Sequence, residues 1–227
     1  MKTEADAFAL AEEMVEVGNA AGKKTAAVIT DMDQPLGEAV GNALEVKEAI
    51  AALKGEFGGD LLELCMVLGS NILMLSGKAD DEASARAMLQ KTIDDGSALR
   101  KLADFVAAQG GDVRCIYDPS LLPTAPVQLE VRAEDNSYVN HMNAEGIGLV
   151  SLHLGGGRTS KDSPIDPAVG VIVKKKTGDY AAAGDVLAVL HAADGETARA
   201  AEAELRACYV FSGVKPEPSP FLKGMVR

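Results

Sequence analysis

The feature that most constrains the fold is a series of helical patterns in the first half of the chain with one strand-like segment among them. Apolar residues recur at helical spacing in five segments, at about 3–18, 40–54, 60–75, 80–94 and 97–109. Thr3 is a candidate N-cap of the first, and Gly18 or Gly22 its end. KTAAVITDM, residues 24–32, predicts a buried strand. Because one strand cannot make a sheet, the helices present apolar faces without a partner in this half.

The second half begins at three prolines, Pro119, Pro123 and Pro126, which indicate a linker or an entry strand. Short β-like segments separated by Gly, Asp and Asn then predict strands within 125–133, 137–144, 148–158 and 168–192. A closing helix is expected over 195–211, with Ala198, Ala201, Leu205 and Cys208 on one face, followed by a proline-spaced tail with little helix propensity. We expect the chain from about Ala125 to fold independently, whereas the first 110 residues depend on a partner.

The charge of the chain is unfavourable for binding nucleic acid. The 227 residues carry a net charge of -12, and phosphate backbones are bound by clustered Lys and Arg. The one basic run, Lys174 to Lys176, is interpreted as the solvated end of a strand. We therefore expect no nucleic-acid partner.

Cysteine content and hydropathy indicate the compartment. Cys65, Cys115 and Cys208 are widely spaced and odd in number, so neither a disulfide framework nor a zinc site is favoured. The first residues carry acids throughout, unlike a signal peptide, and no stretch approaches the length of a membrane span. The expectation is a soluble cytoplasmic protein with no membrane partner.

Several residues with catalytic potential have simpler interpretations. Asp31 and Asp33 could form a carboxylate pair for acid–base chemistry, but a capping or loop-fixing role is favoured for them. His141, His153 and His191 stand far apart without metal-ligand spacing, and we expect surface or hydrogen-bonded histidines.

Five blocks of sequence together resemble one enzyme family. They are GNAAGKKTAAVITDMDQPLGEAVGNALEVKEAIAALKGE, FVAAQGGD, LLPTAPV, LHLGGGRTSKDSPIDPAVGVIV and TGDYAAAGDVLAVLHA. In this order and spacing they are similar to the C-terminal portion of pyrimidine-nucleoside phosphorylases, the thymidine phosphorylase family. The resemblance implies an α/β (α+β) fold. Residues 1–120 would be the second half of the nucleoside phosphorylase α/β catalytic domain, and residues 121–227 the C-terminal, barrel-sandwich-like α/β-hammerhead domain.

The resemblance also implies a reaction and its partners. Such enzymes, pentosyltransferases, reversibly cleave thymidine- or uridine-type nucleosides with phosphate as co-substrate, giving the free base and pentose 1-phosphate. The family's phosphate loop and base-binding Arg, Ser and Lys lie upstream of the matched part, so this chain would need an N-terminal half; a homodimer partner is the other possibility. Met1 corresponds to a methionine that lines the base pocket. The glycine cluster at 154–162 is interpreted as a turn between strands rather than a replacement phosphate site.

The resemblance further implies a monovalent cation, usually K⁺. Its ligands would include the backbone carbonyls of Leu36 and Ala39 and the side chain of Glu48. A hard cation prefers oxygen ligands, and neutral carbonyls with one carboxylate suit a single positive charge. From the residues alone, Glu48 would be interpreted as one more surface acid of a helix.

Two other functions remain open. The chain could be a catalytically silent structural or interaction fragment, including half of a split enzyme. Less favoured is a biotinyl- or lipoyl-like carrier module, because Ala181 to Ala183 occupy the turn and no lysine lies between Lys176 and Lys215. By the same resemblance, the residues that select the nucleoside would lie outside this sequence.

Overall fold

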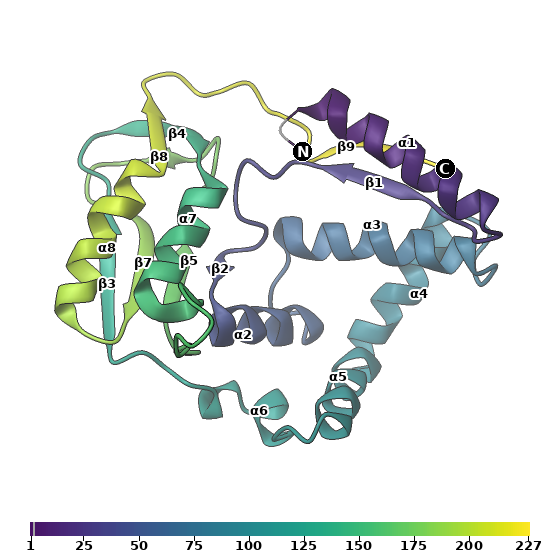
Figure 1. Ribbon diagram of the computed structural model, residues 1–227, viewed down its shortest axis with the longest axis horizontal. Helices are drawn as coiled ribbons and strands as arrows, with labels where there is room; N and C mark the ends of the chain where they lie inside the picture. The colour runs from purple at the N-terminus through teal and green to yellow at the C-terminus, as the bar shows by residue number, and fades with distance from the viewer. Residues whose placement is uncertain (2) are drawn as a thin grey trace. The chain divides into compact units, whose positions relative to one another are not determined.

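The computed structural model describes Met1 and residues 3–227 and has a mixed α/β fold (Figure 1). The described residues form two compact units. The first unit comprises residues 1–31, 58–98 and 219–227, and the second comprises residues 32–57 and 99–218. No helix in the described part of the chain is both long and apolar enough to cross a bilayer.

The first unit contains three helices around a pair of strands. Its elements are α1 (Glu4–Ala20), β1 (Ala27–Thr30), α3 (Gly59–Leu75), α4 (Glu82–Asp94) and β9 (Leu222–Val226). The predicted N-cap of α1 is confirmed, because the Thr3 side chain accepts a hydrogen bond from the backbone N–H of Asp6. Gly22, with a φ of 75°, follows the end of this helix.

The C-terminal tail, for which little helix propensity was expected, forms strand β9. It pairs antiparallel with β1, with Ala27 opposite Val226 and Ile29 opposite Gly224. Figure 1 shows α1 lying along this two-stranded ribbon. The half-buried ion pair between Lys223 Nζ and Asp31 Oδ2, 2.9 Å long, secures the tail. The loop-fixing role expected for Asp31 is therefore confirmed.

The second unit is built on two antiparallel sheets. The first sheet has the order β2-β5-β7-β3, and the second has the order β6-β4-β8. The strands are β2 (Ala39–Val40), β3 (Val127–Arg132), β4 (Ser137–Met142), β5 (Gly170–Val173), β6 (Tyr180–Ala181), β7 (Val186–Ala192) and β8 (Tyr209–Ser212). The helices are α2 (Asn42–Leu53), most of α5 (Ser97–Ala108), α6 (Arg114–Tyr117), α7 (Ala144–Ser151) and α8 (Gly195–Ala207).

Two clusters of buried apolar side chains stabilise the second unit. The larger includes the predicted α8 face, since Ala198, Ala201, Leu205 and Cys208 are all at most 6% exposed. The smaller joins Ile50 of α2, Ala103 of α5 and Ile116 of α6. Burial of this apolar area is the main stabilising contribution to the unit.

One predicted element of the second half is wrong, and the closing helix ends earlier than expected. Residues 148–158, expected as a strand, lie in α7 and in the π-helical turn Leu152–Gly156 that follows it. The buried residues Ile147, Val150 and Leu154 repeat at helical spacing, and Asn143 caps the helix through the N–H of Gly146. The closing helix ends at Ala207, because the aromatic and β-branched residues after it form β8.

Strand β2 extends the sheet of the second half, although it lies in the first half of the sequence. Ala39 is opposite Ile172, and Val40 is opposite Val171. The expectation of an independent second half starting at Ala125 therefore omits residues 32–57, which belong to the same compact unit. The family-domain boundary near residue 120 stays a prediction.

The close approach of β2 and β5 at Gly41 and Gly170 provides a test of this packing. Gly170 has a φ of 151°, and a Cβ there would collide with the carbonyl oxygen of Val40. We expect Gly170→Ala to lower the free energy of unfolding by about 1–3 kcal/mol, measured by urea denaturation of the full chain. Gly213→Ala, in open space, should change it by less than about 0.5 kcal/mol. Equal effects of the two substitutions would contradict the close-approach explanation.

Candidate functional site

The candidate site is the turn at residues 34–39, which precedes β2 and is held by Glu48 of α2. Glu48 Oε1 accepts hydrogen bonds from the backbone N–H groups of Glu38, at 2.7 Å, and Ala39, at 3.1 Å. Gly37 has a φ of 69°, and a Cβ at this residue would collide with Glu48 Oε2. The turn therefore requires glycine both for its backbone conformation and for the approach of the carboxylate.

The basic run Lys174–Lys176 contacts the same turn from the other side. Lys174 Nζ pairs with Glu38 Oε2 at 2.7 Å, and Lys176 Nζ donates to the carbonyl of Pro35 at 2.9 Å. The backbone N–H of Val173 also donates to the carbonyl of Glu38 at 2.7 Å. The run follows the end of β5, as expected, and Lys174 is exposed, but two of its three lysines also bind the turn.

The pKa of the Glu48 carboxyl is raised above its ordinary value. Burial is the largest cause, and the neighbouring carboxylate of Glu38 acts in the same direction. The hydrogen bonds from Glu38 and Ala39 and the ammonium of Lys176 act in the opposite direction but do not cancel the effect. Glu48 is thus a partly desolvated carboxylate that a nearby positive charge would stabilise.

Of the three residues expected to bind a cation, Glu48 and Ala39 are in contact, through the N–H of Ala39 and not through its carbonyl. Leu36 immediately precedes Gly37, and the Glu48 carboxylate lies where a Cβ of residue 37 would be. The expected ligands are all oxygen atoms, the kind that a hard monovalent cation prefers, and the Pro35 carbonyl of the same turn accepts a hydrogen bond from an ammonium group. In the described part of the chain no three His, Cys, Asp or Glu side chains are placed to hold a metal ion.

Comparisons with known proteins match both halves of the chain. Residues 2–99 match the family described as "Glycosyl transferase family, a/b domain", and residues 138–212 match the "Pyrimidine nucleoside phosphorylase C-terminal domain". The chain is 49% identical over 191 residues to the pyrimidine-nucleoside phosphorylase of Geobacillus stearothermophilus, covering 84% of this chain and 44% of the relative. The chain belongs to the pyrimidine-nucleoside phosphorylase family.

Other members of this family show the same extent of similarity. The relative from Bacillus subtilis is 49% identical over 192 residues, covering 85% of this chain and 44% of the relative. The relative from Staphylococcus haemolyticus is 46% identical over 191 residues, with 84% and 44% coverage. The chain thus spans less than half the length of the curated relatives it matches.

The remaining residues named from the sequence lie elsewhere. Met1, expected to line a base pocket, is 71% exposed and belongs to the first unit. His141 is exposed, and His153 Nδ1 lies 2.8 Å from Glu204 Oε2. His191 differs from the prediction of a surface or hydrogen-bonded histidine. It is 9% exposed, and its buried Nδ1 has no hydrogen-bond partner. Burial, followed by the charge of Lys47, lowers its pKa.

The glycine cluster at 154–162 connects a helix to a strand, not two strands as expected. It follows α7 and leads to β5. The carbonyl of Gly156 accepts a hydrogen bond from Asn42 Nδ2 at 2.8 Å beside a cavity of about 390 Å³. Glu45 lines this cavity, and none of its lining residues is basic. This environment is unfavourable for a phosphate group.

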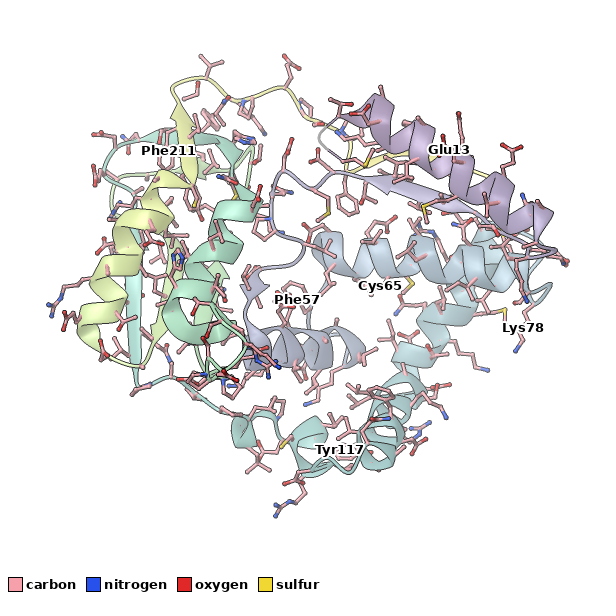
Figure 2. All side chains as sticks on the ribbon, in the orientation of Figure 1. Glu13, Phe57, Cys65, Lys78, Tyr117 and Phe211 are labelled. Carbon is pink, nitrogen blue, oxygen red and sulfur yellow. The ribbon has the colours of Figure 1, made fainter. Side chains whose placement is uncertain are left out.

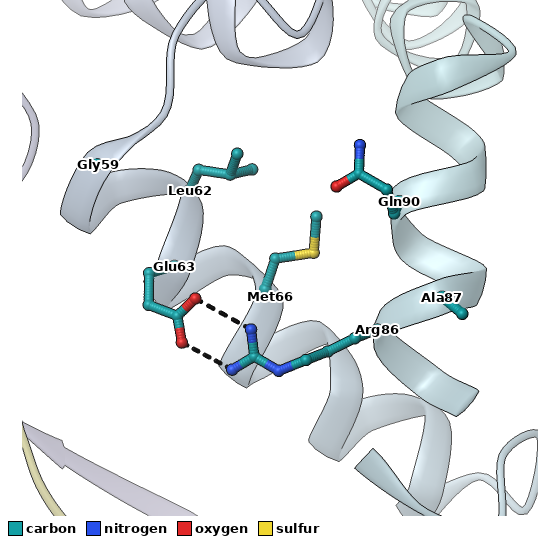
Figure 3. Close-up of a pocket in the computed structure, with 7 residues that line it drawn as sticks. All are labelled: Gly59, Leu62, Glu63, Met66, Arg86, Ala87 and Gln90. Atoms are coloured by element: carbon teal, nitrogen blue, oxygen red, sulfur yellow. Dashed lines mark hydrogen bonds and ion pairs between the residues drawn. The ribbon is translucent and has the colours of Figure 1, made fainter. Parts of the chain in front are cut away.

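A second pocket, of about 410 Å³, lies between α3 and α4 in the first unit (Figure 3). Arg86 dominates it and forms a bidentate pair with Glu63, at 3.0 and 2.7 Å. Arg86 also donates to Glu82 at 2.8 Å. The hydrogen bonds from Arg86 to Glu63 lower the pKa of the Glu63 carboxyl. With its charged groups paired to each other, the pocket is a helix–helix contact and not a second candidate site.

Replacement of Glu48 tests the electrostatics of the turn. Because the folded chain holds the Glu48 proton more tightly than the unfolded chain, the free energy of unfolding should fall as pH rises above the ordinary value of 4.5. We expect Glu48→Gln, which keeps the Oε1 acceptor, to lose this pH-dependent contribution. Urea denaturation from about pH 4 to 7 measures it.

The exposed residue Glu56 near the end of α2 provides the matched control for this measurement. Glu56→Gln should keep the wild-type pH dependence. Identical profiles for Glu48→Gln and the wild-type chain would contradict the raised pKa. Glu48→Ala should additionally cost about 1–3 kcal/mol, because it removes the acceptor of two N–H groups.

Proposed function

We propose that this chain forms the C-terminal part of a pyrimidine-nucleoside phosphorylase. The observation that carries the proposal is 49% identity over 191 residues to enzymes of that name, together with a match to their C-terminal domain. In the proposed reaction a phosphate oxygen bonds to the anomeric carbon of a thymidine- or uridine-type nucleoside. The bond from that carbon to the base nitrogen breaks, and its electron pair leaves with the base. The base nitrogen takes up the proton that the phosphate gives up, and the products are the free base and pentose 1-phosphate.

In this reaction the chain would contribute a cation-binding site at the turn of residues 34–39. We propose that the carbonyls of Leu36 and Ala39 and the carboxylate of Glu48 hold a K⁺ ion. When bound, the ion would supply a fixed positive charge close to the anionic co-substrate. Support comes from the oxygen-only donor set and from the raised pKa of Glu48, a carboxylate that lacks a full counter-charge. Lys174 and Lys176 would act as positioning residues, because they fix the backbone of the same turn.

The proposed partners are the pyrimidine nucleoside, phosphate and a further polypeptide. The phosphate- and base-binding groups would come from an N-terminal part of a family enzyme, in a dimeric assembly. Cytoplasmic location is also part of the proposal, supported by the unpaired state of Cys65, Cys115 and Cys208. The alternative of a catalytically silent fragment or half of a split enzyme is supported by the 44% coverage of the relatives.

We predict that residues 1–227 alone release no uracil or thymine from uridine or thymidine in the presence of phosphate. The reason is that the proposed phosphate- and base-binding groups belong to a part of the family outside this sequence. Chromatography of the free base over several hours measures turnover. Phosphate-dependent base release by the pure chain, at a rate that scales with its concentration, would falsify this prediction.

The cation proposal predicts a dependence on K⁺ in the complete assembly. With the N-terminal part of the B. subtilis relative supplied, K⁺ should stimulate phosphorolysis. Glu48→Gln should raise the K⁺ concentration needed for half-maximal stimulation by about tenfold, the equivalent of about 1.4 kcal/mol in K⁺ binding. Glu56→Gln is the matched control. An unchanged K⁺ dependence in Glu48→Gln would remove Glu48 from the cation site.

A further inference from the structure

We propose that His191 makes the attachment of helix α2 to the large sheet sensitive to acid. The neutral imidazole lies buried beside α2, and Lys47 of this helix binds the chain segment that enters β3. Protonation of the imidazole places a second positive charge near Lys47 and loosens this attachment. The proposal concerns the second unit alone and does not depend on the proposed function.

His191 is a buried polar residue outside the main apolar cluster. It lies in β7, opposite Gly170 of β5 and Gln128 of β3. Directly opposite residues of neighbouring strands share one face of a sheet, whereas adjacent residues of one strand point to opposite faces. Leu190 and Ala192 therefore point to the other face, where they belong to the large cluster. The imidazole is nevertheless only 9% exposed, so another element must cover it.

Helix α2 provides this cover. A Cβ on Gly170 would lie 3.0 Å from Cδ1 of Leu44 in α2, so this helix packs over the position next to His191. Lys47 follows Leu44 by three residues and lies on the same side of the helix. Burial lowers the pKa of His191, and the charge of Lys47 lowers it further. The helix thus both buries the imidazole and brings an ammonium group near it.

Lys47 also joins α2 to the segment that leads into β3. Its Nζ donates hydrogen bonds to the carbonyl of Pro123 at 3.2 Å and to Thr124 Oγ1 at 3.1 Å. We call these two bonds the Lys47 contact. The segment continues into β3, where Gln128 lies opposite His191. One ammonium group therefore connects α2 to this segment and also acts on the imidazole.

The surroundings of His191 do not compensate an added positive charge. Its Nδ1 is buried without a hydrogen-bond partner among the described residues, which is unusual for a polar atom. The two positions opposite it carry no charge. Glu130, two residues further along β3, is paired with Arg132, and Lys174 after β5 is also in an ion pair. Among the described residues, Lys47 supplies the one charge that shifts the pKa of the imidazole.

This arrangement gives local opening a defined dependence on pH. When α2 moves away from the sheet, water reaches His191, and its pKa returns toward the ordinary value of 6.5. Because the opened state binds the proton more tightly, a fall in pH below 6.5 favours opening until the lowered pKa of the covered imidazole is reached. Within this window the opened population rises by up to about tenfold for each pH unit.

The same helix carries Glu48, which holds the turn at residues 34–39. Lys47 and Glu48 are consecutive, so a looser attachment of α2 affects the helix that positions this carboxylate. The two titrations have opposite signs. The raised pKa of Glu48 stabilises the folded chain toward low pH, whereas the lowered pKa of His191 destabilises it. Variants of the two residues are therefore distinguishable.

Hydrogen exchange of the full chain between about pH 5 and 7 tests the proposal, with protection factors corrected for the intrinsic pH dependence of exchange. We expect protection in α2 and in residues 124–128 to fall on acidification by up to about tenfold for each pH unit, with a smaller change in α4. His191→Gln, which cannot titrate, should abolish this response. His141→Gln, at an exposed histidine of β4, should retain it.

Three outcomes of this measurement would overturn the proposal. They are an unchanged protection of residues 124–128 in the wild-type chain, an equal acid response in His191→Gln, and a loss of protection that is uniform across the second unit. The last outcome would mean that His191 affects only global unfolding.

Two lysines at α2 separate the Lys47 contact from a general effect of charge. Lys54, at the C-cap of α2, donates to the carbonyl of Tyr117, which is labelled in Figure 2, at 3.4 Å. Lys47→Met should lower the protection of residues 124–128 at neutral pH by about threefold or more and reduce the further response to acid. Lys54→Met should leave both unchanged. Matching exchange profiles for the two variants would contradict the role of Lys47.

Discussion

The hydrogen bonds from the backbone of Glu38 and Ala39 to the carboxylate of Glu48 organise the second unit around the candidate site. They fix the turn at Gly37, and the turn leads directly into β2. Strand β2 then pairs with β5, where Gly41 and Gly170 let the two backbones approach. A single half-buried carboxylate thus connects the α2 helix, the candidate cation ligands and the edge of a sheet whose other strands come from the second half of the sequence.

The two lysines that contact the same turn illustrate how charge is used in this acidic chain. With a net charge of -12, most of its acids are solvated, and isolated surface pairs contribute little to stability. Lys174 and Lys176 differ because they bind one short turn together, through Glu38 and the carbonyl of Pro35. Their contribution is conformational: they restrict the backbone that presents the carbonyl groups of Leu36 and Ala39.

In the first unit, strand pairing and polar contacts join the two ends of the sequence. Its strands come from opposite ends of the sequence, and the ion pair of Asp31 with Lys223 joins those ends. The hydrogen bond from Arg227 to Asn71, at 3.1 Å, connects the last residue to α3. These polar contacts define the arrangement of the elements, but apolar burial in this unit is small compared with the second. Apolar burial therefore contributes less to the stability of this unit than to that of the second.

The sequence by itself determined the local elements and the family. Caps and periodic apolar positions located α1, α3, α4 and the buried face of α8, because these signals act over three or four residues. The spaced blocks identified the pyrimidine-nucleoside phosphorylase family and, through it, made Glu48 a candidate cation ligand. Only the tertiary structure decided that β9 pairs with β1 and that Lys176 binds Pro35, 141 positions away in the sequence. Such pairings leave no periodic signal in either segment, since each depends on the position of a partner that is fixed only when the whole chain folds.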